Sequence, residues 1–122
     1  MGTIKMSYDL PKDLTLVKAE GGMTPDDFTG WAANYIAKGA TGLILWDLLG
    51  ADMTSLSSDE IRKIVARSKG FVPKGAKTAF VFKRPCDFGV GRMLETYSEV
   101  DELPSKFRAF RSLADAKKWL GI

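Results

Sequence analysis

The chain has 122 residues, of which 45% are hydrophobic and 27% are charged, and this size and balance are typical of one globular domain. It contains no histidine and one cysteine, so imidazole-based catalysis, zinc or haem ligation by His and Cys, and an internal disulfide are excluded. No apolar run approaches the ~18 residues of a membrane-spanning helix, and the N-terminus has no signal-peptide core. We therefore expect a single cytoplasmic domain over residues 1–122.

The N-terminal part predicts a β-hairpin followed by an amphipathic helix. Two β-favouring runs, TIKMSYDL and LTLVKAEG, flank the turn signal PKD. In MTPDDFTGWAANYIAKG, Thr24 is expected to cap a helix, Pro25 suits its first position and Gly39 ends it. Apolar residues recur at helical spacing and form one wide stripe: Phe28, Trp31, Ala32, Tyr35 and Ile36.

The rest of the chain alternates strands and helices. GLILW and TAFVF are short apolar runs typical of strands that are buried on both faces. Between them, Ser57 and Glu60 form a capping box that predicts a second helix. GVGRMLETY predicts a third helix, KFRAF a short edge strand, and SLADAKKWL a fourth helix capped by Ser112. The order β-β-α-β-α-β-α-β-α predicts an α/β fold with a mixed five-stranded sheet and four helices.

The basic residues are unevenly distributed. Residues 62–84 hold eight of the 18 basic residues and none of the 15 acidic ones. A solvated helix face followed by a lysine-rich loop accounts for this pattern, and a surface that attracts an acidic partner is the alternative. No nucleic-acid-binding motif is present, so we expect no sequence-specific nucleic-acid partner.

The segment FKRPCDFGVGRMLETY raises the possibility of an anion site. The free amides at the start of its helix suit an anion, Gly89 and Gly91 would let a ligand approach, and Arg84 and Arg92 add positive charge. The segment lacks the third glycine of a dinucleotide fingerprint and the Gly-Lys-Ser/Thr of a P-loop. Each glycine costs about 1 kcal/mol relative to alanine in a helix. Close packing of the helix on the sheet is the simpler explanation for both glycines, and the anion site is the alternative.

Three further residues flank this helix or the buried strands. Cys86 lies close to Arg84, which would lower the pKa of a redox-active thiol, whereas burial as a small apolar side chain is the simpler expectation. Asp87 is expected at the N-cap, where its carboxylate would repel a phosphate. Asp47 follows GLILW, so we expect it beside Arg84 at the carboxyl edge of the parallel strands, where open α/β sheets bind ligands.

The tryptophans have separate expected places. Trp46 is assigned to the core and Trp31 to the contact between the first helix and the sheet. Trp119 lies off the apolar stripe of the last helix, so a role in a homodimer surface is left open.

Three phrases, GLILWDLLGADMTSLSSDEI, KTAFVFKRPCDFGVGRMLETY and FRAFRSLADAKKWL, cover most of the chain from residue 41 onward. They resemble the STAS domain (sulfate transporter and anti-sigma-factor antagonist), and more closely its small bacterial SpoIIAA-like branch. In anti-sigma-factor antagonists, the loop after the buried strand carries Asp-Ser-Ser/Thr-Gly, and a partner kinase phosphorylates its hydroxyl. The corresponding loop spans residues 52–57, where Thr54 and Ser55 are the nearest acceptors and the glycine is missing.

The resemblance implies a non-enzymatic, cytosolic protein-binding or regulatory module without a cofactor or a metal. The wider superfamily also includes lipid- or small-ligand-binding domains of the Sec14 type. A lipid or small anionic ligand at the carboxyl edge of the strands, held by Arg84 and Arg92, is therefore the alternative. This chain is too short for the extra helices that form a deep lipid pocket there, which leaves a shallow apolar groove open. The third hypothesis, after the regulatory module and the ligand-binding protein, is an enzyme that uses Asp47 or Cys86.

Overall fold

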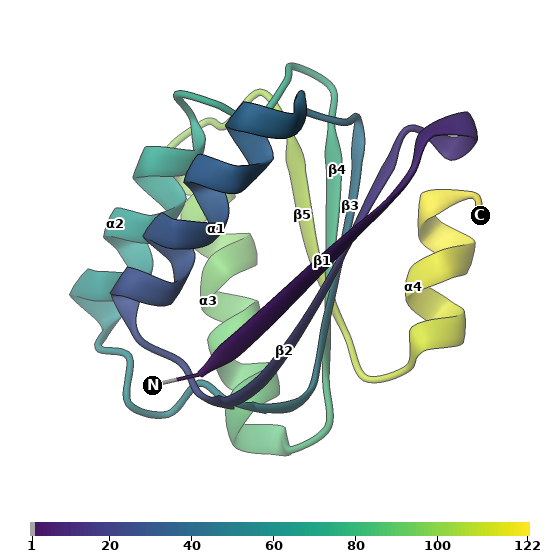
Figure 1. Ribbon diagram of the computed structural model, residues 1–122. Helices are drawn as coiled ribbons and strands as arrows, with labels where there is room; N and C mark the ends of the chain where they lie inside the picture. Colours follow the sequence, from purple (N-terminus) through teal and green to yellow (C-terminus); the bar gives the residue numbers. More distant parts are fainter. Residues whose placement is uncertain (1) are drawn as a thin grey trace.

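The computed structural model describes residues 2–122 and contains one sheet with helices on both of its faces (Figure 1). The strands lie in the order β1-β2-β3-β4-β5; β1 is antiparallel to β2, and all other neighbours are parallel. This arrangement confirms the predicted fold class and hairpin. The elements are β1 (Thr3–Asp9), η1 (Leu10–Lys12), β2 (Leu14–Gly22), α1 (Pro25–Lys38), β3 (Leu43–Asp52), α2 (Ser58–Ser68), β4 (Lys77–Phe82), α3 (Pro85–Val100), β5 (Lys106–Phe110) and α4 (Leu113–Leu120).

The two faces of the sheet are covered unequally. Helices α1, α2 and α3 lie on one face, and the short α4 lies on the other (Figure 1). Successive residues of a strand point to opposite faces, so in β3 Ile44 and Trp46 face the three helices while Leu45 faces α4. The predicted interior strands run side by side, with Ile44 opposite Thr78 and Trp46 opposite Phe80. The main core therefore lies under α1, α2 and α3.

Side-chain caps fix the helix starts that the sequence predicts. In α1, Thr24 donates its backbone N–H to Asp27 Oδ2 over 2.8 Å. In α2, Ser57 and Glu60 bond reciprocally, at 2.9 Å and 3.1 Å. Each such cap stabilises a helix by about 1 kcal/mol. No helix of residues 2–122 has both the length and the apolar character that crossing a membrane requires.

The start of α3 differs from the prediction. Arg84 is the N-cap and Pro85 is the first helical residue, so the expectation that Asp87 caps the helix is wrong. Proline has a fixed φ and no N–H, which suits it to the first helical position and moves the start three residues earlier. Asp87 lies inside the first turn, and its carboxylate accepts a hydrogen bond from the Met53 N–H at 2.8 Å.

The two glycines of α3 have different surroundings. A Cβ added to Gly91 would overlap the Phe82 ring and lie 2.8 Å from Ala109 Cβ, so close packing on the sheet accounts for this glycine. A Cβ added to Gly89 would meet no atom within 4 Å, so packing does not require glycine there. The simpler explanation is confirmed for one position only.

The expectation for one apolar residue, Ile36, is wrong, whereas the homodimer role left open for Trp119 stays a prediction. Ile36 was expected on the buried stripe of α1, but it is 56% exposed because it borders an open pocket between α1 and α2. Trp119 packs within the chain: its ring centroid lies 5.8 Å from that of Phe110, and the Lys77 ammonium lies 5.3 Å from its centroid. Trp31 and Trp46 are buried as expected.

Candidate functional site

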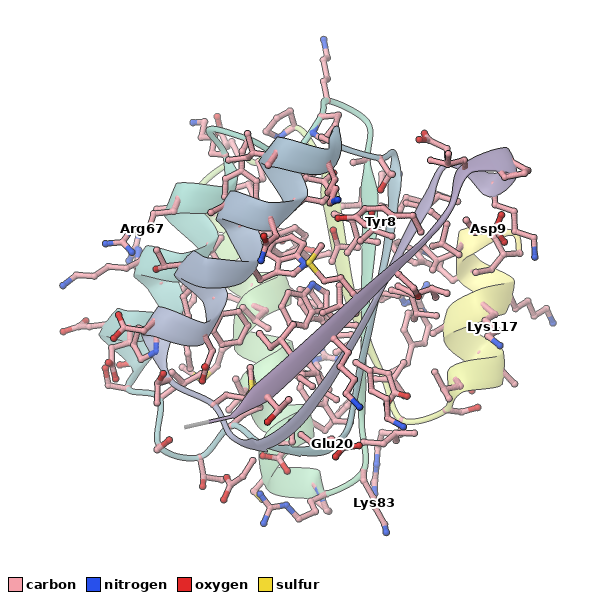
Figure 2. The ribbon with its side chains drawn as sticks, in the orientation of Figure 1. Tyr8, Asp9, Glu20, Arg67, Lys83 and Lys117 are labelled. Atoms are coloured by element: carbon pink, nitrogen blue, oxygen red, sulfur yellow. The ribbon has the colours of Figure 1, made fainter. Side chains whose placement is uncertain are left out.

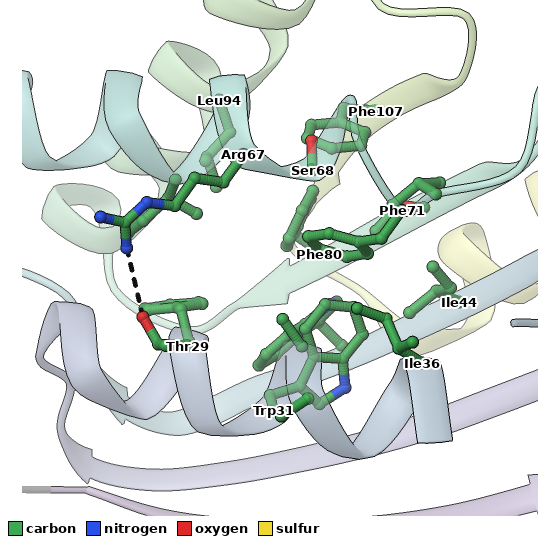
Figure 3. A pocket seen from close by; sticks show the side chains of 17 residues that line it. Thr29, Trp31, Ile36, Ile44, Arg67, Ser68, Phe71, Phe80, Leu94 and Phe107 are labelled. Atoms are coloured by element: carbon green, nitrogen blue, oxygen red, sulfur yellow. Dashed lines mark hydrogen bonds between the residues drawn. The ribbon is translucent and has the colours of Figure 1, made fainter. Parts of the chain in front are cut away.

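A cavity of about 340 Å³ lies between α1 and α2, above the helix-covered face of β3, β4 and β5 (Figure 3). Ile44, Thr78 and Phe107 line it, and each is the second residue of its strand, so the cavity lies toward the amino ends of the parallel strands. An engineered cavity of ~150 Å³ is large enough to bind benzene. The cavity in this protein has roughly twice that volume, so it has room for a molecule about twice as large as benzene.

Aromatic side chains form a continuous wall around the cavity. The ring centroids of Trp31 and Trp46 are 4.8 Å apart, those of Trp46 and Phe80 are 6.3 Å apart, and those of Phe80 and Phe107 are 5.4 Å apart. Phe71, which follows α2, lies edge-on to Trp31 at 5.9 Å. Flat apolar molecules, and aromatic rings in particular, pack favourably against such a surface.

Small side chains on α1 leave the space open. Ala32 and Ala33 line the cavity from α1, where a large residue would close the gap to α2. The exposed side chain of Ile36 lies at the mouth. Across the mouth, Arg67 of α2 donates a hydrogen bond from Nη1 to Thr29 Oγ1 of α1, over 3.3 Å (Figure 3).

Few polar groups interrupt the apolar lining. Thr78 is 2% exposed, and its Oγ1 has no hydrogen-bond partner. The Ser68 hydroxyl, in contrast, donates to Val65 O at 2.6 Å. Arg67 is the one charged side chain among the lining residues. Its guanidinium has no carboxylate oxygen within 4 Å in residues 2–122.

The predicted anion site lies at the opposite end of the sheet and contains paired charges. Arg84 donates from Nε to Asp87 Oδ2 at 2.6 Å, and its Nη2 lies 3.0 Å from Asp52 Oδ1. The Asp87 carboxylate raises the pKa of Arg84 above its usual range. Hydrogen bonds from Thr54, and secondarily from Arg84, lower the pKa of Asp52. An anion at Arg84 would have to compete with two carboxylates.

The other residues predicted for that site are scattered. Asp47 lies within β3 on the α4 face, where its Oδ1 accepts the Leu49 N–H at 3.1 Å. The expectation that Asp47 ends the strand beside Arg84 is wrong, because β3 continues to Asp52. Arg92 is exposed and lies 3.7 Å from Glu95. Anion binding by Arg84, Arg92 and the two glycines stays a prediction.

The remaining predicted groups are accessible. Cys86 is exposed, so its expected burial is wrong: α3 packs on the sheet through its opposite side, and this residue of the first turn faces solvent. Thr54 is exposed and donates its hydroxyl hydrogen to Asp52 Oδ1 at 2.5 Å. Ser55 donates to Met23 O at 3.1 Å. Phosphorylation of these two hydroxyls and a redox role for the thiol stay predictions.

No protein-family model and no curated protein sequence matches the chain. Among solved structures, it is similar to an anti-sigma factor antagonist from Mycobacterium paratuberculosis, with a TM-score of 0.65 and 17% identity over 100% of this chain and 96% of that one. It is also similar to an uncharacterised DUF3478-family protein with a SpoIIAA-like fold from Shewanella loihica PV-4. The TM-score of that match is 0.62, with 17% identity over 98% of this chain and 93% of that one.

These matches define the class of fold. The chain has a SpoIIAA-like α/β fold, as the resemblance seen in the sequence implied. At 17% identity the likeness concerns the fold alone. Any specific task has to be argued from the chain's own residues.

The sequence did not predict the cavity. Trp46 was assigned to the core, Trp31 to the contact between the first helix and the sheet, and Arg67 to a solvated basic face. The usable signals were the two adjacent alanines in the middle of an aromatic-rich helix and the arginine two residues after Val65, the last apolar residue of the α2 stripe. Neither signal reveals how far apart α1 and α2 lie.

Proposed function

We propose that the chain is a non-enzymatic, ligand-binding regulatory module that holds one small, mainly apolar molecule between α1 and α2. The cavity of about 340 Å³ with its aromatic wall is the observation that carries the proposal. Small-molecule sites typically enclose about 300–1,000 Å³, with an apolar lining and a few polar groups.

The lining supports binding rather than chemistry. Proton transfer and nucleophilic catalysis need groups such as carboxylates, thiols, imidazoles or amines close to the substrate. The lining residues include no Asp, Glu, Cys or Lys, and the sequence has no histidine. Arg67 and Thr78 are suited to orienting a ligand by charge and hydrogen bonding.

Helix α2 connects the cavity to the loop over residues 52–57. Arg67 and Ser68, in its last turn, line the cavity, and Ser57 caps its first turn at the end of the loop over residues 52–57. A ligand that packs against α2 would stabilise that helix and thereby the loop. A partner that binds the loop would then respond to the ligand, by the linkage between two sites that share one element.

A second candidate function is partner binding controlled at Thr54 or Ser55. It is favoured by the exposure of the Thr54 hydroxyl and by the fold shared with an anti-sigma factor antagonist. Incubation with a kinase that phosphorylates such antagonists, followed by mass spectrometry, tests it. Phosphate on either residue would support this candidate, and an unchanged mass would count against it.

Filling the cavity tests the main proposal. The neutral two-ring probe 2-naphthol should bind the wild-type chain, as measured by isothermal titration. Ala32→Leu adds volume inside the cavity and should weaken binding by about tenfold or more. Ala37→Leu, on the exposed side of α1, is the matched control and should leave binding unchanged. Equal binding by both variants, or no binding by the wild type, would rule the proposal out.

A further inference from the structure

We infer that the ligand is an amphipathic monocarboxylate: its carboxylate binds Arg67, its apolar body lies against the aromatic wall, and a hydrogen-bonding group at its far end reaches Thr78. This inference rests on the proposed function and adds the chemical class of the ligand.

The first observation is the pairing of Arg67. Arg62, Arg84 and Arg92 each have a carboxylate partner. Within residues 2–122, Arg67, Arg108 and Arg111 have none, but Arg108 lies over the Phe110 ring and Arg111 donates to Lys83 O. Of these three arginines, Arg67 is the one that lines the cavity. Arg67 donates one hydrogen bond, to the neutral hydroxyl of Thr29. A guanidinium has five N–H donors in a planar fork that matches a carboxylate. Most of the donor capacity of Arg67 therefore remains for a ligand.

The second observation is the position of that cation. Arg67 lies beside α1 and α2, whereas Lys83 lies far from it at the lower end of the sheet (Figure 2). The stem of Arg67 lines the cavity, and its guanidinium bridges to α1 at the mouth (Figure 3). The nearest acidic residues on α1, Asp26 and Asp27, line a different pocket, between α1 and β1. An anion at the mouth of the cavity therefore meets a local positive charge.

The third observation lies inside the cavity. Thr78 is almost fully buried, and its hydroxyl has no partner. Buried hydroxyls are normally hydrogen-bonded, and a missing bond is costly. A purely hydrocarbon ligand would leave this hydroxyl unpaired. A ligand with a hydroxyl or a carbonyl at its inner end would pair with it.

The volume limits the size of the ligand. About 340 Å³ is roughly twice the ~150 Å³ of a cavity that accepts benzene, so a two-ring aromatic body or a chain of similar bulk fits. A phospholipid with two long acyl chains is much larger. The aromatic wall favours a flat body. The expected class is thus a hydroxylated or oxo-substituted monocarboxylate with an apolar body of about two rings.

Three related probes separate the contributions. We expect 6-hydroxy-2-naphthoate to bind best, 2-naphthoate to bind more weakly because it lacks the inner hydroxyl, and neutral 2-naphthol to bind most weakly. Isothermal titration at pH 7 measures all three. Arg67→Gln should lower the affinity for both naphthoates by about tenfold, because hydrogen bonds to charged groups are the stronger ones, and leave 2-naphthol unchanged.

Matched variants control for net charge and for folding. Lys63→Gln removes the same charge from an exposed position of α2 outside the cavity and should leave all three affinities unchanged. In the wild type, 6-hydroxy-2-naphthoate should bind about threefold to tenfold more tightly than 2-naphthoate. Thr78→Val should abolish this difference and leave the affinity for 2-naphthoate unchanged. Circular dichroism melting curves verify that each variant is folded.

The outcomes distinguish this inference from the proposed function. If Arg67→Gln binds the naphthoates as tightly as the wild type does, the carboxylate assignment is overturned, even where Ala32→Leu still abolishes binding of 2-naphthol. If Thr78→Val keeps the preference for the hydroxylated probe, the inner contact is overturned. If no probe binds the wild type, both the inference and the proposed function fail.

Discussion

The two ends of the sheet differ in how their arginines are paired. At the carboxyl end, Arg84 bonds two carboxylates, and the buried Asp87 also accepts the Met53 N–H, so α3 and the loop after β3 are tied together. At the amino end, Arg67 has no carboxylate partner, and it borders a cavity that contains an unpaired hydroxyl. The comparison indicates that the carboxyl end stabilises the fold and that the amino end is suited to a ligand.

The largest expected effect is on stability at the carboxyl end. Asp87→Ala removes a buried carboxylate that bonds Arg84 and the Met53 N–H, and should lower the free energy of unfolding by about 3 kcal/mol. Urea denaturation measures the change. Arg92→Ala, at an exposed arginine of the same helix, is the control and should change the free energy by less than about 0.5 kcal/mol. Similar losses for the two variants would contradict a structural role of the Asp87 network.

The glycines of α3 give a second, smaller contrast. Gly91→Ala should destabilise the chain by about 1–2 kcal/mol, because the new Cβ would press on Phe82 and Ala109. Gly89→Ala meets no neighbour and should stabilise α3 by up to about 1 kcal/mol through its higher helix propensity. Thermal unfolding of both variants measures the difference. A stabilising Gly91→Ala would show that α3 does not pack as closely as described.

Replacing each of two buried threonines, Thr15 and Thr78, by valine tests whether the amino end of the parallel strands is optimised for stability. Thr15 Oγ1 lies 2.7 Å from Thr41 Oγ1, so Thr15→Val should cost about 1 kcal/mol of unfolding free energy. Thr78→Val removes an unpaired hydroxyl and should stabilise the ligand-free chain by about 1 kcal/mol. Chemical denaturation gives both values. Equal losses would mean that Thr78 already has a partner and is not kept for a ligand.

The smallest expected effect is a pH dependence at Asp52. Hydrogen bonds from Thr54, with a further one from Arg84, lower the pKa of this carboxyl in the folded chain. A group whose folded pKa is lowered contributes stability above its unfolded pKa of about 3.9, and this contribution is lost as the pH falls through the folded value. The stability advantage of the wild type over Asp52→Asn should therefore be constant between pH 5 and pH 7 and vanish in more acidic solution. An advantage that persists in strong acid would contradict the assignment.

Local patterns in the sequence were sufficient to predict the architecture. Helical spacing, the Ser57–Glu60 capping box and the two apolar strand runs each depend on neighbouring residues, and all three are confirmed. The start of α3 was misplaced because a proline after a strand competes with a nearby aspartate for the helix start. The exposure of Ile36 was missed because periodicity identifies the apolar side of a helix and not whether another element covers it.

The candidate site was harder to predict than the fold. A cavity is a property of the distance between α1 and α2, which the packing of the whole chain determines. Arg84 looked available in the sequence because its near partner, Asp87, was expected to cap the helix and its second partner, Asp52, lies 32 positions away. Arg67 looked like one of many surface cations because the sequence does not show that it borders a cavity. Contacts between residues far apart in the sequence decide which arginine is available to a ligand, and a single sequence does not show these contacts.

The most direct test is to map where a small apolar ligand binds. Titration of the ¹⁵N-labelled chain with 2-naphthol should shift the backbone amide signals of residues 31–36, 64–72, Thr78 and Phe107, which surround the cavity. The signals of residues 84–92 should change little. Shifts concentrated at residues 84–92, or none around the cavity, would contradict the account and return the carboxyl edge of the strands as the place to look for a ligand.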